Sequence, residues 1–507
     1  MTEAVWAALL PPYLIGLALS FGVEAGLAPR PVAPWRRPMA AAGVHAGVWT
    51  LAFALELMLF RRPYFAVANV LAIELLIVLV SNAKHRALRE PFVYPDFEYF
   101  TDAIRHPRLY LPFFGVGRAL AAAAGYGLAL WAGLALEAPV AAGAAAAAAG
   151  LAALGTALAA WAGRRLVVVF DAAADLKRLG LASALWAYGR QERQAADELR
   201  ANAPFSPART LSGSAPPAPD PMPDLVVIQS ESFFDARRAY PSLRPEILGN
   251  FDLLKAESAR HGRLHVAAWG ANTVRTEFAF LSGMHGQALG IHQYNPYRRL
   301  AQGGFPTLAS YLKSLGYRTI CVHPYHRSFY RRDKALPLLG YDEFIGMEAF
   351  SDAPLAGPYV GDRAVGDKVA SLLAERDSRP LYIHAITMEN HGPLHWETVT
   401  PADAEAVLLG PMPAGCEDLV AYARHLRNAD AMLGSLRTFL AGRAWPASLC
   451  VFGDHVPIMP AVYEKMGDTD GATDYLLWQS ATQGAAVAQD CDVASLARTY
   501  LALNGLA

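Results

Sequence analysis

Residues 225–233 read LVVIQSESF, a short apolar run rich in β-branched side chains that ends in Ser230-Glu231-Ser232. Such a run is typical of a buried strand. Reactive groups in open α/β sheets collect at the carboxyl ends of the strands, so Glu231 stands where a carboxylate suits a divalent metal ion. The stretch predicts a parallel-sheet domain that begins near residue 224.

Four more β-rich runs follow, and amphipathic helical stretches lie between them. The runs are Leu264–Ala268, Thr319–Val322, Leu381–Ile386 and Leu449–Phe452, and the helical stretches lie near 246–259, 305–315, 361–376 and 417–441. This alternation predicts an α/β domain with a largely parallel central sheet over 224–507.

Polar residues follow each of these runs. The second run leads to Thr273 near the start of a helix, where backbone N–H groups favour a phosphate. The third leads into 323–333, whose imidazoles, aromatic rings and guanidinium groups fit a phosphate with an attached polyol. The fourth leads to His391, and the fifth to Asp454-His455. Taken with Glu231, three of these residues complete a possible ligand set of three oxygens and one nitrogen, which suits manganese, magnesium or zinc: Thr273, Asp454 and His455.

Each residue also has a plainer interpretation. Glu231 alone is more often a helix cap or a solvated carboxylate, and Thr273 after an Asn is a common N-cap. Arg331 reads as part of a solvated face, and His391 before Gly-Pro as a turn residue. Their occurrence in order, each at a strand end of one domain, favours the catalytic interpretation.

These segments together resemble the lipoteichoic acid synthase and phosphoglycerol transferase branch of the alkaline phosphatase/sulfatase superfamily, over about residues 224–500. The matching motifs are Glu231-Ser232, Gly270 to Thr273 with Glu277-Phe278, Phe329-Tyr330-Arg331-Arg332-Asp333, Asn390-His391-Gly392-Pro393 and Gly453-Asp454-His455. The resemblance implies an alkaline phosphatase/sulfatase-like fold outside the cytoplasmic membrane.

The resemblance also implies the roles of the site residues. One divalent ion, Mn²⁺ before Mg²⁺ or Zn²⁺, would be held by Glu231, Thr273, Asp454 and His455. Thr273 would be the nucleophile and His391 the acid–base group. The substrate would contact five side chains: His323, Tyr330, Arg332, His391 and Arg275. Tyr330 replaces the usual Trp, and Arg275 lies close to the nucleophile, so the headgroup or acceptor can differ from that of the family.

The activity implied is transfer of glycerol phosphate from phosphatidylglycerol, through a Thr273 intermediate, to a glycan or glycerol phosphate acceptor. A phosphoethanolamine transferase or another phosphodiesterase of the superfamily is the alternative. A sulfatase would need a C/S-x-P-x-R segment, which 273–277 does not supply. A non-catalytic phospholipid- or glycan-binding membrane protein, or a transporter using Glu56, Glu74 and Arg118 inside predicted spans, is the alternative of another class.

The first half of the chain predicts a membrane domain. Charged residues are only 18% of the 507, and the mean hydropathy is positive. Apolar runs near 4–23, 39–60, 64–82, 112–136 and 138–162 predict five spans within residues 1–163, with an interfacial segment near 83–110. The first run lacks a basic n-region and a cleavage site, so we expect it to be retained.

An amphipathic connector and a Pro-rich linker at 164–223 join this domain to the catalytic one. The net charge of −1 gives no field that would favour nucleic acid as a partner. Four scattered cysteines form no C-x-x-C pair, so neither a zinc knuckle nor a dense disulfide framework is indicated.

The charge pattern of the loops conflicts with the resemblance over orientation. Basic residues of the first and third loops would place those loops and the catalytic domain in the cytoplasm by the positive-inside rule: Arg30, Arg36, Arg37, Lys84, Arg86, Arg89, Arg105 and Arg108. The resemblance places the catalytic domain outside an inner membrane. Contact of these residues with anionic phosphatidylglycerol headgroups, worth about 1 kcal/mol per charge, would reconcile the two.

Overall fold

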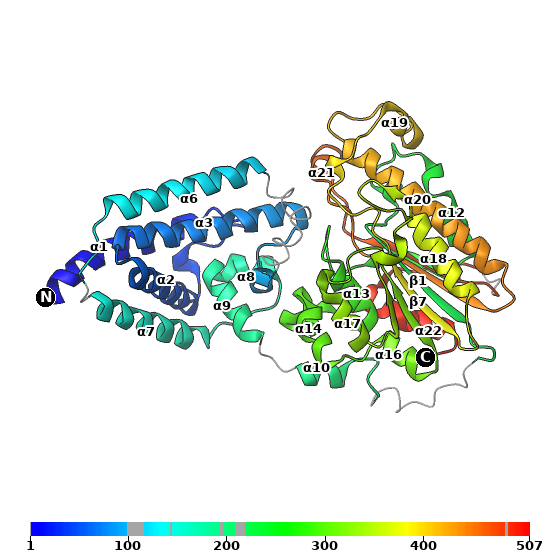
Figure 1. Ribbon diagram of the computed structural model, residues 1–507, viewed down its shortest axis with the longest axis horizontal. Coiled ribbons are helices and arrows are strands. Elements are labelled where there is room, and N and C mark those ends of the chain that lie inside the picture. The colour runs from blue at the N-terminus through cyan, green and yellow to red at the C-terminus, as the bar shows by residue number, and fades with distance from the viewer. Residues whose placement is uncertain (1, 99–115, 142–143, 193–195, 208–218, 482–484) are drawn as a thin grey trace. The chain divides into compact units, whose positions relative to one another are not determined.

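A computed structural model of the protein describes residues 2–98, 116–141, 144–192, 196–207, 219–481 and 485–507 (Figure 1). The chain forms two compact units, Met1–Gln194 and Ala195–Ala507. The connector predicted at 164–223 is divided between them. Helices α8 (Ala172–Leu179) and α9 (Leu181–Gln191) belong to the first unit, and α10 (Ala196–Asn202) belongs to the second.

The first unit is helical, as predicted. Its long helices are α1 (Thr2–Glu24), α2 (Met39–Phe60), α3 (Pro63–Leu88), α6 (Val116–Leu136) and α7 (Ala144–Gly163). Within the described residues, four helices are long and apolar enough to cross a membrane: α1, α2, α3 and α7.

These four helices correspond to four of the five predicted spans. The remaining one, predicted at 112–136, falls on α6, whose apolar part among the described residues is Ala123–Leu136, so the count of five stays a prediction. Residues 112–115 of that predicted span lie outside the described residues. In the predicted interfacial segment, 83–88 continue α3, Tyr94–Glu98 form the 3-10 turn η2, and 99–110 lie outside the described residues.

Polar side chains within the first unit pair with one another. Arg37 donates to Glu24 over 2.5 Å, Asn69 donates to Glu56 over 2.7 Å, and Lys84 donates to Asp96 over 2.6 Å. Since the guanidinium of Arg37 and the ammonium of Lys84 bind carboxylates within the unit, the headgroup explanation does not hold for these two residues. The side chain of Arg118 lies outside the described residues.

The second unit is built on a nine-stranded sheet in the order β10-β2-β9-β8-β1-β7-β3-β4, with β11 paired to β2. The strands are β1 (Asp224–Ser230), β2 (Arg260–His265), β3 (Arg318–Val322), β4 (Glu343–Ile345), β7 (Leu381–Ile386), β8 (Ala447–Gly453), β9 (Thr473–Gln479), β10 (Val487–Ala488) and β11 (Cys491–Asp492). A separate hairpin joins β5 (Leu355–Ala356) to β6 (Tyr359–Val360). The predicted α/β fold with a mostly parallel sheet is confirmed.

Strand β9 is the antiparallel exception. It runs opposite to both β8 and β2, so β2 has the same direction as β1. The run predicted at Leu264–Ala268 is displaced, because β9 begins at Thr473, opposite Leu264, and offers later residues no partner. The carboxyl ends of β1, β2, β3, β7 and β8 therefore meet at one edge of the sheet.

Two helical layers cover the sheet (Figure 1). Val226 and Ile228 of β1 enter one core, covered by α12 (Gly249–Glu257), α18 (Asp362–Ala374) and α20 (Glu417–Ala441). Leu225 and Val227 enter the other, covered by α13 (Thr273–Ser282), α16 (Leu308–Ser314), α17 (Arg332–Leu338) and α22 (Val493–Leu503). Short helices complete the unit: α14 (Gly286–Leu289), α15 (Pro296–Arg299), α19 (Pro401–Val407) and α21 (Pro460–Met466).

Close approach of α2 and α7 depends on two glycines. A Cβ at Gly47 would lie 2.6 Å from the backbone nitrogen of Ala159, and one at Gly155 would lie 2.7 Å from the carbonyl oxygen of Gly47. Small residues let helices pack this closely in a membrane. A side chain at either position would push the two helices apart.

We expect Gly155→Leu to destabilise the first unit by about 1–3 kcal/mol, because the new side chain meets backbone that cannot move aside. Thermal unfolding of the full chain in detergent measures the loss. Gly150→Leu in the same helix is the matched control, since a Cβ there meets nothing within 4 Å. Equal melting temperatures for the two variants would contradict the close packing.

Candidate active site

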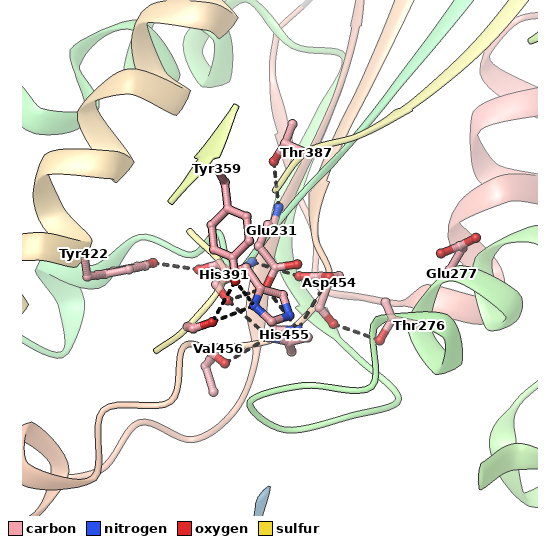
Figure 2. Close-up of polar contacts among 12 residues, drawn as sticks. Glu231, Thr276, Glu277, Tyr359, Thr387, His391, Tyr422, Asp454, His455 and Val456 are labelled. Atoms are coloured by element: carbon pink, nitrogen blue, oxygen red, sulfur yellow. Dashed lines mark hydrogen bonds and ion pairs between the residues drawn. The ribbon is translucent and has the colours of Figure 1, made fainter. Parts of the chain in front are cut away.

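Three acidic and imidazole side chains meet where neighbouring strands end. Strand β1 lies between β8 and β7, and Ser230 at its end is in register with Gly453 of β8. Glu231 follows β1, and Asp454 and His455 follow β8, so the parallel register brings all three together (Figure 2). Their ligand atoms lie within 4.8 Å of one another and are buried, so the group could hold a metal ion.

The hydrogen bonds around this group leave its ligand atoms available. Nδ1 of His455 donates to the carbonyl of Val456 over 3.1 Å, which turns Nε2 toward Glu231, 3.4 Å from its Oε1. Ser232 donates from its backbone N–H to Oδ1 of Asp454 over 2.9 Å. Within the described residues, Asp454 Oδ2 and His455 Nε2 are buried without a hydrogen-bond partner. Two orphaned ligand atoms beside a carboxylate fit a divalent cation.

The electrostatics of the group point the same way. Burial raises the pKa of Glu231 to about 8, and the neighbouring carboxylate of Asp454 adds to the shift. Two carboxylates crowded away from water are unfavourable unless a proton or a cation offsets their charge. A divalent ion would favour the ionised form of both, since the ion's own charge reverses the local effect.

Thr273 is the first residue of α13, and only 7% of it is exposed. Asn272 before it adopts a left-handed backbone with φ of 64° and makes no side-chain cap bond, so the helix begins at Thr273 itself. One turn later, Thr276 donates to the carbonyl oxygen of Asp454 over 2.8 Å (Figure 2). Residues three apart share a helix face, so Thr273 lies on the face of α13 that meets the ligand group.

Arg332 is fixed in a buried ion pair. Its Nη2 donates to Oε2 of Glu277 over 2.7 Å, and the two side chains are 1% and 0% exposed. Its Nη1 donates to Nε2 of His323 over 3.2 Å, while Nδ1 of His323 donates to the carbonyl of Ile386 over 3.1 Å. The hydrogen bonds of His323 among the described residues are thus with Arg332 and the backbone, which suits orientation of the guanidinium.

His391 lies beside the ligand group together with Tyr359 (Figure 2). Its Nδ1 donates to the carbonyl of Gly392 over 2.8 Å, so Nε2 of the neutral ring carries the lone pair. Burial lowers the pKa of His391, and the charge of Arg332 adds to that shift. A neutral imidazole with an available Nε2 suits proton transfer.

Tyr330 and Arg275, the other two predicted substrate contacts, lie in different surroundings: Tyr330 contacts Arg332, and Arg275 contacts Tyr294. The guanidinium of Arg332 lies over the ring of Tyr330, 5.3 Å from its centroid, so Tyr330 belongs to the same cluster. Arg275 lies over the ring of Tyr294 at 5.0 Å and donates from Nε to the Tyr294 carbonyl over 3.3 Å. These contacts tie Arg275 to the 290–294 turn.

Several residues that support the site were not singled out from the sequence. Thr387 accepts from the backbone N–H of Glu231 over 3.0 Å and directly follows β7, a position that could have marked it. Thr276 and Glu277 lie in the segment that begins at Thr273; Glu277 belongs to one of the matching motifs, but its contact with Arg332 was not predicted. His425 lies in the middle of α20 and bonds Glu389 over 2.7 Å, and no local pattern marks it.

Comparison with known proteins identifies the class. The Sulfatase family model matches residues 223–506, so the chain belongs to the sulfatase family. This confirms the resemblance to the alkaline phosphatase/sulfatase superfamily. The enzymes of that superfamily transfer or hydrolyse phosphoesters and depend on metals. The chain's N-terminal helical unit precedes the matched region.

Among individual proteins, the chain is similar to capsular polysaccharide biosynthesis protein RkpI of Rhizobium meliloti, with 32% identity over 261 residues, 50% of this chain and 45% of that protein. It is 26% identical over 253 residues to the "Putative cyclic beta-1,2-glucan modification protein" of the same organism, covering 50% of this chain and 38% of that one. These matches span less than half the length of each relative.

One similar solved structure is Streptococcus pyogenes phosphoglycerol transferase GacH in complex with sn-glycerol-1-phosphate. It is 17% identical, with a TM-score of 0.47, and covers 62% of this chain and 80% of that one.

We expect Mn²⁺ or Zn²⁺ to raise the melting temperature of the wild-type full chain, because an ion that binds only the folded state at about 100 times its Kd stabilises by about 2.7 kcal/mol. Asp454→Asn should lose this shift. Asp224→Asn is the matched control, since Asp224 lies at the opposite end of β1 and binds Arg443 over 2.6 Å. A shift that survives in Asp454→Asn would argue against this metal site.

Proposed function

We propose that the chain is a membrane-bound, metal-dependent phosphoglycerol transferase that moves glycerol phosphate from phosphatidylglycerol to a glycan or glycerol phosphate acceptor. The observation that carries the proposal is the buried group of Glu231, Asp454 and His455, with two orphaned ligand atoms, tied through Thr276 to the helix that begins at Thr273. In this proposal Thr273 is both nucleophile and fourth ligand.

Glu231, Asp454 and His455 would hold the divalent ion, which when bound would supply the positive charge that favours ionisation of the Thr273 hydroxyl and polarises a phosphoryl oxygen. Oγ of Thr273 attacks phosphorus, the bond to diacylglycerol breaks, and the hydroxyl proton ends on the diacylglycerol oxygen. Glycerol phosphate then remains on Thr273. The helix N-terminus adds backbone N–H groups that favour the phosphate.

In the second half of the reaction, the acceptor hydroxyl attacks phosphorus and Thr273 leaves. The acceptor's proton passes to Nε2 of His391 and from there to the Thr273 oxygen. Arg332, oriented by Glu277 and His323, offers its guanidinium to the phosphate or to the glycerol hydroxyls. Tyr330, stacked on Arg332, would form part of the same pocket.

The choice of donor and acceptor rests on three supports. The motif pattern resembles phosphoglycerol transferases, and the four apolar helices give the chain access to a lipid donor. The name of RkpI refers to capsular polysaccharide, which favours a glycan acceptor.

Phosphoethanolamine transfer is the second candidate, with the substitutions at Tyr330 and Arg275 as its basis. Lipid A phosphoethanolamine transferases, which the chain also resembles, carry several disulfides, whereas all four cysteines here are free and three are buried. The cysteines therefore favour glycerol phosphate. A non-catalytic role is disfavoured because the ligand atoms converge as an enzyme would need.

We place the catalytic unit on the periplasmic or extracellular side of a multi-pass inner membrane protein. The loop charges oppose this orientation, but Arg37 and Lys84 pair with carboxylates inside the first unit and contribute less than their number implies. The lipid donor and a surface glycan would both be available on that side.

We expect Thr273→Ala to lower release of diacylglycerol from phosphatidylglycerol by about three orders of magnitude or more, because the covalent step is deleted. The assay uses full-length protein with Mn²⁺ and labelled phosphatidylglycerol. Ser282→Ala is the control, since this hydroxyl of the same helix donates to the Phe278 carbonyl over 2.6 Å and accepts from the backbone N–H of Met284 over 3.3 Å. Wild-type turnover by Thr273→Ala would sink the mechanism, and mass spectrometry of trapped Thr273 identifies the headgroup.

For orientation, we expect external protease to remove a C-terminal epitope from spheroplasts, because the catalytic unit lies outside. A cytoplasmic marker protein should survive the same treatment. An epitope that is protected in spheroplasts and degraded in inverted vesicles would place the unit in the cytoplasm.

A further inference from the structure

A buried histidine links both ends of the loop that carries His391. The loop leaves β7 and runs from Glu389 to Glu397. Nδ1 of His425 bonds Oε1 of Glu389 over 2.7 Å, and Nε2 bonds Oε2 of Glu397 over 2.8 Å. His425 belongs to α20 and is 1% exposed. One side chain of a rigid helix thus holds both loop ends.

Burial alone would lower the pKa of His425, but its hydrogen bonds to Glu389 and Glu397 outweigh that effect and raise the pKa to about 9. The ring is therefore an imidazolium at neutral pH, with both nitrogens donating to carboxylates. Charge-assisted bonds of this kind are shorter and stronger than neutral ones.

Other contacts extend the same arrangement. Glu389 also accepts from Asn428 of α20 over 2.6 Å and from the backbone N–H of Asp362 over 2.7 Å. Glu397 accepts from Arg424 over 2.6 Å, and a Cβ at Gly357 would lie 2.8 Å from its carboxylate. The hairpin that contains Gly357 also carries Tyr359, which donates to Gly392 over 3.2 Å.

The geometry is that of a bridge between two carboxylates and not of a second metal site. The two nitrogens of one imidazole point in opposite directions, so Glu389 and Glu397 cannot share an ion with His425. Between the two anchored ends lies Asn390, which is 1% exposed and whose amide atoms make no hydrogen bond to the described residues. Among the described residues, the side chain of His391 bonds only within this loop and to the neighbouring hairpin, through Gly392 and Tyr359, so the two anchored ends fix the segment that carries it.

We propose that His425 is a positioning residue: by bridging Glu389 and Glu397 it fixes the 389–397 loop and keeps His391 in place for proton transfer. The proposal rests on the proposed function, since His391 is the acid–base group of that reaction. His425 itself touches neither donor nor acceptor. Its loss should therefore lower kcat and leave the binding of donor nearly unchanged.

The test compares full-length wild type with His425→Gln. We expect kcat for phosphatidylglycerol to fall about 10- to 100-fold, because small displacements of an acid–base group cost that much, with KM unchanged within about twofold. Hydrogen exchange of the peptide covering 388–397 should become faster. Added imidazole should restore part of the rate of His425→Ala.

Asp430→Asn is the matched control for loss of a buried group from the same helix. Asp430 accepts from the backbone N–H of Phe251 over 2.7 Å and does not contact the loop. It should lower the melting temperature without lowering kcat more than about twofold. If His425→Gln fails to fold, Glu397→Gln, which breaks only the outer bond, is judged by the same criteria.

The outcomes separate this inference from the proposed function. Unchanged loop exchange in His425→Gln, or a wild-type kcat, overturns the positioning role. If wild type does not turn over phosphatidylglycerol but His425→Gln still speeds hydrogen exchange of the 388–397 peptide, the proposed function is wrong. The role of His425 in fixing the loop is then still supported. Equal losses of kcat in His425→Gln and Asp430→Asn would reduce His425 to a structural residue.

Discussion

The arrangement of the second unit depends on two carboxylates that are buried side by side. Glu231 and Asp454 follow neighbouring parallel strands, and the register that pairs Ser230 with Gly453 forces them together away from water. Such a pair is unfavourable without a compensating charge. The surrounding hydrogen bonds orient the ligand atoms and do not neutralise them, so a proton or a bound cation has to offset the charge, and the three side chains could hold such a cation.

The helices around the sheet hold reactive groups at this edge by buried polar contacts. Thr276 ties α13 to Asp454, Glu277 of the same helix fixes Arg332, and Thr387 fixes the backbone of Glu231. Breaking one partner of a buried pair leaves an uncompensated group, which costs more than the pair itself contributes. The site is therefore rigid because the alternatives leave buried polar atoms unsatisfied.

Sequence patterns predicted those strands and site residues that depend only on neighbouring residues in the chain. A buried run followed by a carboxylate located β1 and Glu231, and the same logic located β7 and β8. The pattern misplaced β2, whose extent depends on where its partner β9 begins. His425 was missed because its partners, Glu389 and Glu397, lie 36 and 28 residues away. Such contacts exist only after folding.

The polar residues of the membrane unit bear on the choice between enzyme and transporter. Charged groups inside spans mark a transport path when they line a cavity. Here Glu56 accepts from Asn69, and Glu24 binds Arg37 and also the backbone N–H of Leu181 at the start of α9. These bonds join one helix to the next, which is the role expected of a structural pair. Glu74, also considered for transport, differs, because its Oε2 is buried without a hydrogen-bond partner among the described residues. The group of side chains that could hold a metal ion, by contrast, lies in the second unit.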